Sequence, residues 1–146
     1  MTLPTTEFYV DRAARELQVV FPPDYRRFLL ERNGGEVQPV FAENDEDFDP
    51  FIFFPVFDDS DRRHATKTAD HLVANHRSAT EWVDFPEAAL AIGEEDGTGN
   101  YFVLLDTGAG LTDTIYHWDH ESGEVVKFAD SITAFEQLTE IPINWW

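Results

Sequence analysis

The sequence predicts an α+β fold in a single domain. Helical periodicity is present at both ends of the chain, and a run of short strand-like segments, interrupted once by a helix, lies between them. This order favours α+β, because a parallel βαβ sheet needs strands and helices that alternate. The length of 146 residues fits one domain, and 14% aromatic residues predict a core rich in phenylalanine.

The first helix is predicted over about residues 6–19. Apolar side chains recur there at the three- and four-residue spacing that places them on one helical face. They are Val10, Ala13, Ala14, Leu17 and Phe21. The prolines that follow predict a turn into the next element.

A second helix should begin at Pro23, because proline suits the first helical position, whose N–H has no partner within the helix. Tyr25, Phe28 and Leu29 then form one apolar face. The segment Asn33-Gly34-Gly35 predicts the end of this helix, since glycine adopts left-handed backbone angles at little cost.

The middle of the chain predicts two strands and a third helix. The strands are expected at residues 37–41 and 51–57, and Pro55 places the second strand at an edge or a bulge of the sheet. A helix is expected over about residues 66–79, where the apolar face is Ala69, Leu72, Val73 and His76. His76 is therefore interpreted as a partly buried core residue.

Two hairpins and a last helix complete the prediction. Residues 90–92 and 101–106 should pair around a glycine-rich turn, and residues 114–118 and 125–128 should pair around a second turn. Ser131 should cap a helix that presents Ile132, Phe135 and Leu138. One core should be shared by Tyr25, Phe28, Leu29, Phe102, Leu104, Trp118 and Phe135.

Four of these segments carry a family resemblance. In order, they are residues 21–35, 89–104 (ALAIGEEDGTGNYFVL), 115–121 (IYHWDHE) and 128–135 (FADSITAF). Together they resemble the SUKH superfamily of Smi/Knr-like bacterial immunity proteins, which are related to a yeast cell-wall regulator. The resemblance implies one SUKH-like domain over residues 1–146, with helices packed on a mainly antiparallel, mixed β-sheet. Residues 36–85 have no counterpart in it.

The charge is strongly acidic, with 29 Asp and Glu against 10 Lys and Arg, a formal net charge of −19. Such a surface repels nucleic-acid phosphates and anionic membranes, and it attracts basic proteins. The alternative is an acidic surface kept for solubility or for high salt, which the presence of only two lysines, Lys67 and Lys127, would also fit.

The remaining composition predicts a cytoplasmic protein. The absence of cysteine excludes disulfides and thiol chemistry and fits a reducing compartment. No apolar run approaches the ~20 residues of a membrane span, and the first residues lack the form of a signal peptide.

Asp45, Asp47 and Asp49 have the spacing of the first ligands of a calcium loop. An EF-hand also needs glycine at its sixth position and glutamate at its twelfth, where this chain has Pro50 and Val56. The segment is therefore interpreted as an acidic loop. Phe48 within it either anchors a partner or packs back onto the core.

Gly97-Thr98-Gly99 invites comparison with a phosphate-binding loop. That fingerprint needs a third glycine, where Phe102 stands, and a following helix, where a strand is predicted. Glu94, Glu95 and Asp96 would also repel phosphate. The segment is interpreted as a turn.

His117 and His120, with Asp119 and Glu121, are the candidate metal ligands or catalytic groups. On an extended strand the two histidines point to opposite faces, although a turn beginning at Asp119 could bring them together. No nucleophile-elbow motif surrounds any serine, and Ser131 is explained as a helix cap. We expect no catalysis, no metal and no cofactor.

The resemblance implies a non-enzymatic immunity protein that binds and neutralises a cognate polymorphic toxin, such as a nuclease, through its acidic surface. The expected partner is a basic toxin domain. The partner-binding residues predicted first are Glu43, Asp45, Glu46, Asp47, Phe48, Asp49, Asp58, Asp59 and Asp61, followed by Glu94, Glu95 and Asp96. The alternatives are a housekeeping regulatory or scaffold protein of the same fold and a small metal-dependent hydrolase that uses the residue 117–121 cluster.

Overall fold

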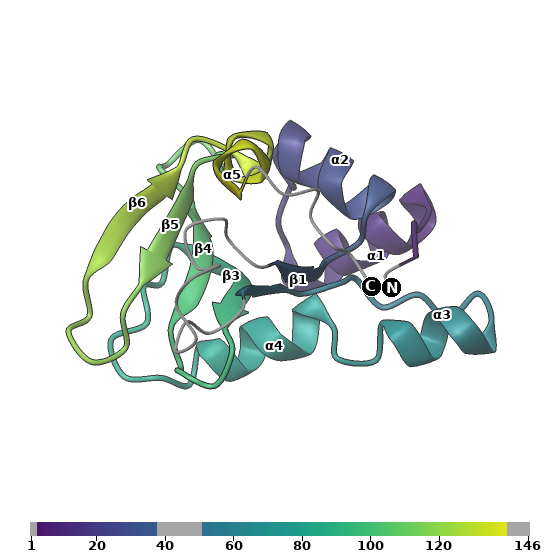
Figure 1. Cartoon of the computed structure of the whole chain (residues 1–146), viewed down its shortest axis with the longest axis horizontal. Helices are drawn as coiled ribbons and strands as arrows, with labels where there is room; N and C mark the ends of the chain where they lie inside the picture. The colour runs from purple at the N-terminus through teal and green to yellow at the C-terminus, as the bar shows by residue number, and fades with distance from the viewer. Residues whose placement is uncertain (1–2, 38–50, 140–146) are drawn as a thin grey trace.

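The computed structural model describes residues 3–37 and 51–139 (Figure 1). These residues form, in order, α1 (Glu7–Leu17), α2 (Pro23–Glu31), β1 (Gly35–Val37), β2 (Phe51–Phe53), α3 (Arg62–Lys67), α4 (Leu72–Ala79), β3 (Ala89–Glu95), β4 (Tyr101–Leu105), β5 (Ile115–Trp118), β6 (Val125–Ala129) and α5 (Ile132–Thr139). The predicted α+β class is confirmed.

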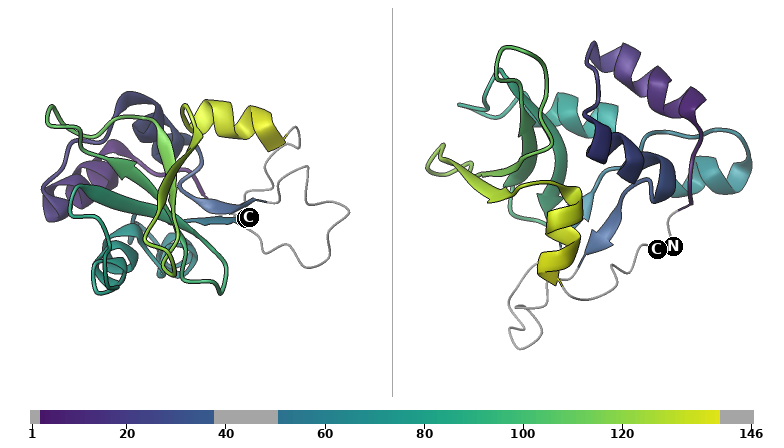
Figure 2. Two further views of the ribbon diagram at one scale, coloured as in Figure 1. Left: turned by 90° about the vertical axis from the view of Figure 1, so that its left-hand side faces the viewer. Right: turned by 90° about the horizontal axis from the view of Figure 1, so that it is seen from above.

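The described strands form one sheet in sequence order, from β1 to β6, and every neighbouring pair is antiparallel. Figures 1 and 2 show α2 and α5 together on one face of this sheet and α4 on the other. Helix α1 contacts both α2 and α4. The sheet therefore lies between two helical layers, and its aromatic side chains can be buried from both sides.

The predicted core is confirmed. All seven residues that the periodicity assigned to it belong to a single buried cluster, together with Phe51, Phe53 and Ile132. The rings of Phe51, Phe102 and Phe135 lie within 4.7–6.1 Å of one another, measured between centroids. Aromatic contacts at these separations add to the free energy gained by burying the rings.

The end of α2 forms as its sequence predicts, and it is attached to the chain beyond β2. Asn33 has a φ of 51° and Gly34 a φ of 86°. The Asn33 side chain accepts a hydrogen bond from the Val56 backbone N–H at 2.8 Å and donates one to the Val56 carbonyl at 3.1 Å. The amide thus satisfies both backbone groups of a buried residue.

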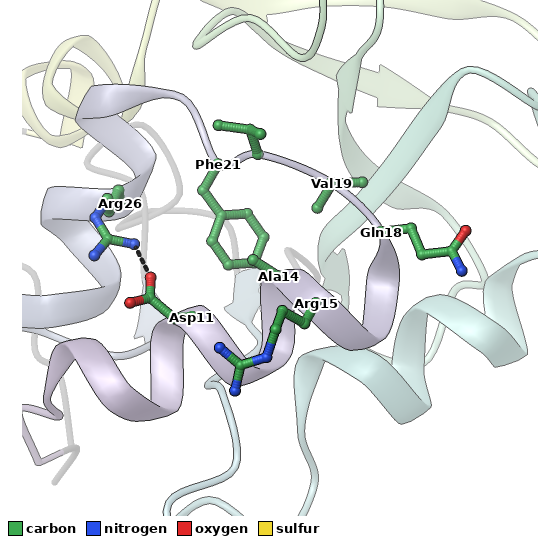
Figure 3. Close-up of a pocket in the computed structure, with 8 residues that line it drawn as sticks. Asp11, Ala14, Arg15, Gln18, Val19, Phe21 and Arg26 are labelled. Carbon is green, nitrogen blue, oxygen red and sulfur yellow. Dashed lines mark hydrogen bonds and ion pairs between the residues drawn. The ribbon is translucent and has the colours of Figure 1, made fainter.

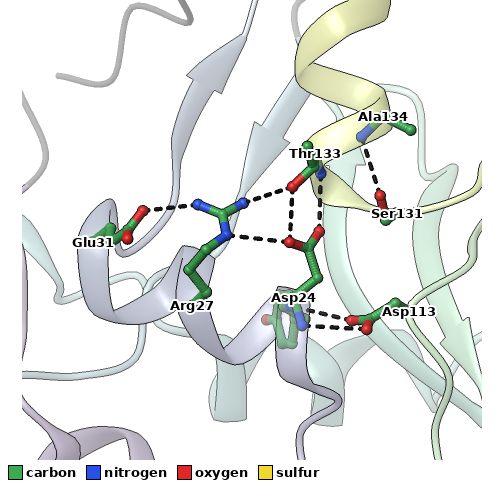
Figure 4. A network of polar contacts seen from close by, with 8 residues as sticks. Asp24, Arg27, Glu31, Asp113, Ser131, Thr133 and Ala134 are labelled. Atoms are coloured by element: carbon green, nitrogen blue, oxygen red, sulfur yellow. Dashed lines mark hydrogen bonds and ion pairs between the residues drawn. The ribbon is translucent and has the colours of Figure 1, made fainter.

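The start of α2 is held by side chains from distant parts of the chain (Figure 4). Pro22 at the N-cap offers no side-chain acceptor, and the Asp113 carboxylate accepts hydrogen bonds from the backbone N–H groups of Asp24 and Tyr25 at 3.2 and 3.0 Å. Ser131 caps α5 as predicted, accepting a hydrogen bond from the Ala134 N–H at 3.1 Å.

The predicted helix over residues 66–79 was wrong in its extent. The structure has two helices there, α3 and α4, separated by residues 68–71. The Thr68 hydroxyl accepts a hydrogen bond from the Asp58 backbone N–H at 2.9 Å, and the His71 ring accepts one from the Ala74 N–H at 3.2 Å. These side chains provide local partners that compete with a continuous helix.

The predicted strands before this region also need correction. The strand expected at 51–57 ends at Phe53, before Pro55, and it lies inside the sheet between β1 and β3 rather than at an edge. The strand expected at 37–41 is described only as β1, and residues 38–41 lie outside the described residues. Both predicted hairpins are confirmed, and no strand boundary differs from its prediction by more than three residues.

Candidate functional site

The acidic loop predicted to bind a partner lies outside the described residues. It comprises Glu43, Asp45, Glu46, Asp47, Phe48 and Asp49. Neither its calcium-like spacing nor the position of Phe48 is tested, and the loop stays a prediction. The described partner candidates are in two places, residues 58–61 and residues 94–96.

Asp58 is a structural carboxylate, in contrast to its prediction as a surface residue. Its exposed fraction is only 2%. The carboxylate accepts hydrogen bonds from the Thr5 hydroxyl at 2.7 Å and the Ser60 N–H at 2.9 Å. Burial alone would raise the pKa of Asp58, but these hydrogen bonds and the nearby His64 lower it below its usual value. We therefore leave Asp58 out of the candidate surface.

Asp59 and Asp61 are exposed, but both already have partners. Asp59 lies 3.6 Å from the Arg12 guanidinium. Asp61 caps α3 by accepting a hydrogen bond from the His64 N–H at 2.8 Å, and it also contacts the His64 ring at 2.9 Å. The hydrogen bonds from His64 lower the pKa of Asp61, and the same contact raises the pKa of His64. Their charges are partly balanced within the protein.

Glu94 and Asp96 form a different acidic group, to which the structure adds Asp70. In the described part of the chain, neither the Glu94 nor the Asp96 carboxylate has a hydrogen-bond or ion-pair partner. Burial, together with the charges of Asp70 and Asp96, raises the pKa of Glu94. We call Asp70, Glu94 and Asp96 the acidic cluster. Here folding brings like charges together, and no lysine or arginine among the described residues pairs with Glu94 or Asp96.

Glu95 faces the opposite side of the sheet from Glu94. Its Oε1 atom contacts Nε2 of His117 on β5, across the intervening strand β4. His117 also packs edge-on against Phe102, with ring centroids 5.5 Å apart. Glu95 is thus paired internally and is a weaker candidate for partner binding than its two neighbours.

The residues proposed as a metal or catalytic cluster do not converge. His117 contacts Glu95, whereas His120 contacts the side-chain oxygen of Asn100 through Nδ1 at 2.7 Å. Asp119 accepts hydrogen bonds from the backbone of the turn that follows it. Among the residues that the structure describes, no group of three or more His, Asp or Glu side chains could hold a metal ion.

The glycine-rich segment is a turn, as predicted. Gly97 and Gly99 have φ values of 77° and 82°, and the Thr98 N–H donates to the Glu95 carbonyl at 3.1 Å. The side chain of Trp82 packs on this turn, because a Cβ atom added at Gly99 would lie 3.0 Å from the indole. The turn therefore joins the acidic cluster to an aromatic residue that the sequence analysis did not select.

Trp82 and Val83 are the functional candidates that the sequence reasoning missed. Their exposed fractions are 42% and 80%, which is large for apolar side chains in a connecting segment. One sequence signal could have found this region, because no lysine or arginine occurs between Arg77 and Lys127. The carboxylates in that interval are Glu81, Asp84, Glu87, Glu94, Glu95, Asp96, Asp106, Asp113, Asp119, Glu121 and Glu124.

A hollow of about 610 Å³ lies beside the connection from α1 to α2 (Figure 3). The Arg26 guanidinium and the Asp11 carboxylate, 2.8 Å apart, form one side of it. Its other lining residues include Ala14, Arg15 and Phe21. Two arginines line this hollow, so its charge does not suit a basic partner, and none of the predicted site residues that the structure describes contributes to it.

Comparison with known families agrees with this fold. The model of the SMI1 / KNR4 family (SUKH-1) matches residues 4–137. The match confirms the resemblance carried by the four sequence segments and extends it through residues 36–85. A comparison with curated proteins gives no match. No helix in the described ranges is long and apolar enough to cross a membrane.

Proposed function

The chain belongs to the SMI1 / KNR4 family (SUKH-1), and from this premise we propose that it is an immunity protein that binds and neutralises a cognate bacterial toxin. In this proposal the chain acts as a binding protein in the cytoplasm and performs no chemistry itself. Its partner is a basic toxin domain, such as a nuclease. The mechanism is occlusion of the toxin's active cleft by an acidic surface.

The observation that carries the proposal is the acidic cluster. Asp70 precedes α4, Glu94 is at the end of β3 and Asp96 is in the following turn, and the charges of the two aspartates help to raise the pKa of Glu94. A carboxylate held near like charges costs folding free energy, and such groups are concentrated at functional sites. A lysine or arginine from a partner would replace this repulsion with attraction.

The distribution of charge supports the same surface. The ten basic residues are Arg12, Arg15, Arg26, Arg27, Arg32, Arg62, Arg63, Lys67, Arg77 and Lys127, so the strands β3, β4 and β5 contain none. A nuclease cleft is positively charged because it binds phosphate, and an acidic surface is complementary to it. Glu94 and Asp96 thus become the first candidates among the described residues, ahead of Asp59 and Asp61.

The test is protection from the cognate toxin domain, sought first among the products of the neighbouring genes. Co-expression should restore growth of cells that produce this domain. The purified chain should inhibit the toxin at a one-to-one ratio, with a Kd in the nanomolar range or below. After denaturation and separation, the toxin should have an unchanged mass and recover its activity, because it was occluded and not modified. Absence of a complex at about 1 μM of both proteins, a concentration that marks weak binding, contradicts the proposal.

A further inference from the structure

We infer that Trp82 is the aromatic anchor of the partner interface, and that it receives a cationic side chain of the basic toxin domain while Val83 supplies an apolar contact. This inference rests on the proposed function and deepens it, because it assigns the centre of the interface to one side chain. The surface comprises Trp82, Val83, the turn between β3 and β4, and the turn between β5 and β6.

The indole of Trp82 is held in place although it is exposed. Its ring lies 4.9 Å from the ring of His120, measured between centroids, and it packs against Gly99. Its side chain also contacts Tyr101 on β4: burial raises the pKa of Tyr101, and the contact from Trp82 opposes that rise. A large side chain already fixed in the free protein loses little conformational freedom on binding, and this favours affinity.

The strand residues next to Trp82 are paired with a member of the acidic cluster. Glu94, Tyr101 and Trp118 lie directly opposite one another on β3, β4 and β5. The Tyr101 and Trp118 rings are stacked, with centroids 6.2 Å apart. Tyr101 therefore pairs with Glu94 across the sheet and also contacts Trp82, so one partner surface can contact both Glu94 and Trp82.

The charges around Trp82 indicate what the partner offers. Glu81 and Asp84 flank the Trp82-Val83 pair, and the β5–β6 turn carries Glu121 and Glu124, all exposed. Gly123 of that turn faces Asp84, since a Cβ added there would lie 3.9 Å from the Asp84 Cβ. An aromatic face surrounded by carboxylates is a favourable site for an arginine or lysine, through cation–π attraction and Coulombic attraction together.

Phe8 provides the contrast within the same molecule. It is the other large exposed aromatic residue among the described ones, with an exposed fraction of 61%. The Arg12 guanidinium of the protein itself already lies over the Phe8 ring, 5.9 Å from its centroid. In the described part of the chain no arginine or lysine lies over Trp82 in this way. Phe8 is therefore the matched control: it is an exposed aromatic residue whose ring is already in contact with a cation of the protein itself.

The experiment measures binding of a catalytically inactivated variant of the cognate toxin domain, sought first among the products of the neighbouring genes. Trp82→Ala should weaken binding on the order of 30-fold or more, mainly by faster dissociation, as is typical of a central anchor. Trp82→Phe should retain most of the affinity, Trp82→Lys should abolish it, and Phe8→Ala should leave it unchanged. Hydrogen exchange of the wild-type complex should show protection at residues 81–84, 96–100 and 119–124, a readout that does not depend on the folding of any variant.

The outcomes separate this inference from the function on which it rests. If the wild-type chain forms no complex, the proposed function fails and the inference fails with it. If the complex forms and Trp82→Ala binds as tightly as Phe8→Ala, or if residues 81–84 gain no protection, the protein remains an immunity protein and the anchor is not Trp82.

Discussion

Thr133 on α5 donates two hydrogen bonds to the carboxylate of Asp24 on α2, one from its backbone N–H at 2.9 Å and one from its hydroxyl at 2.8 Å. Arg27 joins both residues, with Nε 3.1 Å from Asp24 and Nη2 3.1 Å from the Thr133 hydroxyl. Asp24 therefore ties α2 to α5, on the face of the sheet away from the acidic cluster.

We predict that Asp24→Ala lowers the free energy of unfolding at pH 7 by about 1–3 kcal/mol, the range for hydrogen bonds to a charged group. Burial alone would raise the pKa of Asp24, but the bonds from Thr133 and Arg27 bring it below its usual 3.8. A lowered folded-state pKa contributes stability above the unfolded value, and that contribution disappears as the pH falls through the folded value. Urea unfolding should show the lower unfolding free energy of Asp24→Ala at pH 7. The difference between variant and wild type should shrink below about pH 4. An equal difference at pH 7 and pH 2.5 contradicts the carboxylate's role.

The second prediction compares two glycines with similar backbone angles. Gly34 has a φ of +86°, and an added Cβ would lie 2.6 Å from the Phe53 carbonyl oxygen and 2.8 Å from the Pro55 nitrogen. Gly97 has a φ of +77°, with nothing within 4 Å of an added Cβ. Gly97→Ala should cost only backbone strain, about 1–2 kcal/mol. Gly34→Ala should cost at least about 3 kcal/mol, because overlap with backbone adds to the strain. If chemical denaturation gave equal losses of unfolding free energy for the two variants, the close approach of Gly34 to β2 would be contradicted.

The third prediction separates structural from surface carboxylates in residues 58–61. Asp58→Asn should destabilise the protein by about 1–3 kcal/mol, because a buried, hydrogen-bonded charge is replaced by an amide that cannot accept all the same bonds. Asp59→Asn should change stability by less than about 1 kcal/mol, the usual worth of an exposed ion pair. Thermal and urea unfolding measure both. Asp58→Asn should leave toxin affinity unchanged under conditions in which the variant remains folded.

Local sequence signals predicted the elements whose determinants are local. The proline at the start of α2, the Asn33–Gly35 end and the two glycine turns are each determined by residues a few positions apart. The structure has them where the sequence placed them. The shared core was equally predictable, because periodic apolar residues must face one another once the elements pack.

Contacts distant in sequence account for what the sequence did not reveal. The break between α3 and α4 depends on Thr68 bonding to Asp58, and the burial of Asp58 depends on Thr5, 53 residues away. Asp70 and Trp82 join the candidate surface only because α4 packs on β3. Neither has a local pattern that marks it.

The fourth prediction concerns the acidic loop outside the described residues. Neutralising Asp45, Asp47 and Asp49 together should slow association with the toxin at low salt, with a weaker effect at high salt, because exposed charges steer encounter and salt screens them. Phe48→Ala should mainly raise the dissociation rate. Stopped-flow kinetics at two salt concentrations measure both. If the triple variant associates at the wild-type rate at low salt, this loop is not part of the steering surface and residues 94–96 become the main candidates.

The last prediction is that Glu94→Gln makes the free protein more stable and the complex slower to form. Because burial and the charges of Asp70 and Asp96 raise the pKa of Glu94 above its usual 4.5, the folded wild type loses stability as the pH rises from that value through the raised one. Glutamine carries no charge to repel, so the variant should gain up to about 1 kcal/mol at pH 7 and nothing at pH 4. The same substitution removes a charge that attracts a basic toxin, so association at low salt should slow several-fold.

Glu16→Gln, which removes an exposed charge on α1, is the matched control and should change neither the stability of the free protein nor the association rate. If Glu94 served stability or solubility alone, Glu94→Gln would not both stabilise the free protein and slow its association with the toxin. If Glu94→Gln lowers the melting temperature at pH 7, or associates at the rate of Glu16→Gln, the acidic cluster is not the surface that meets the toxin.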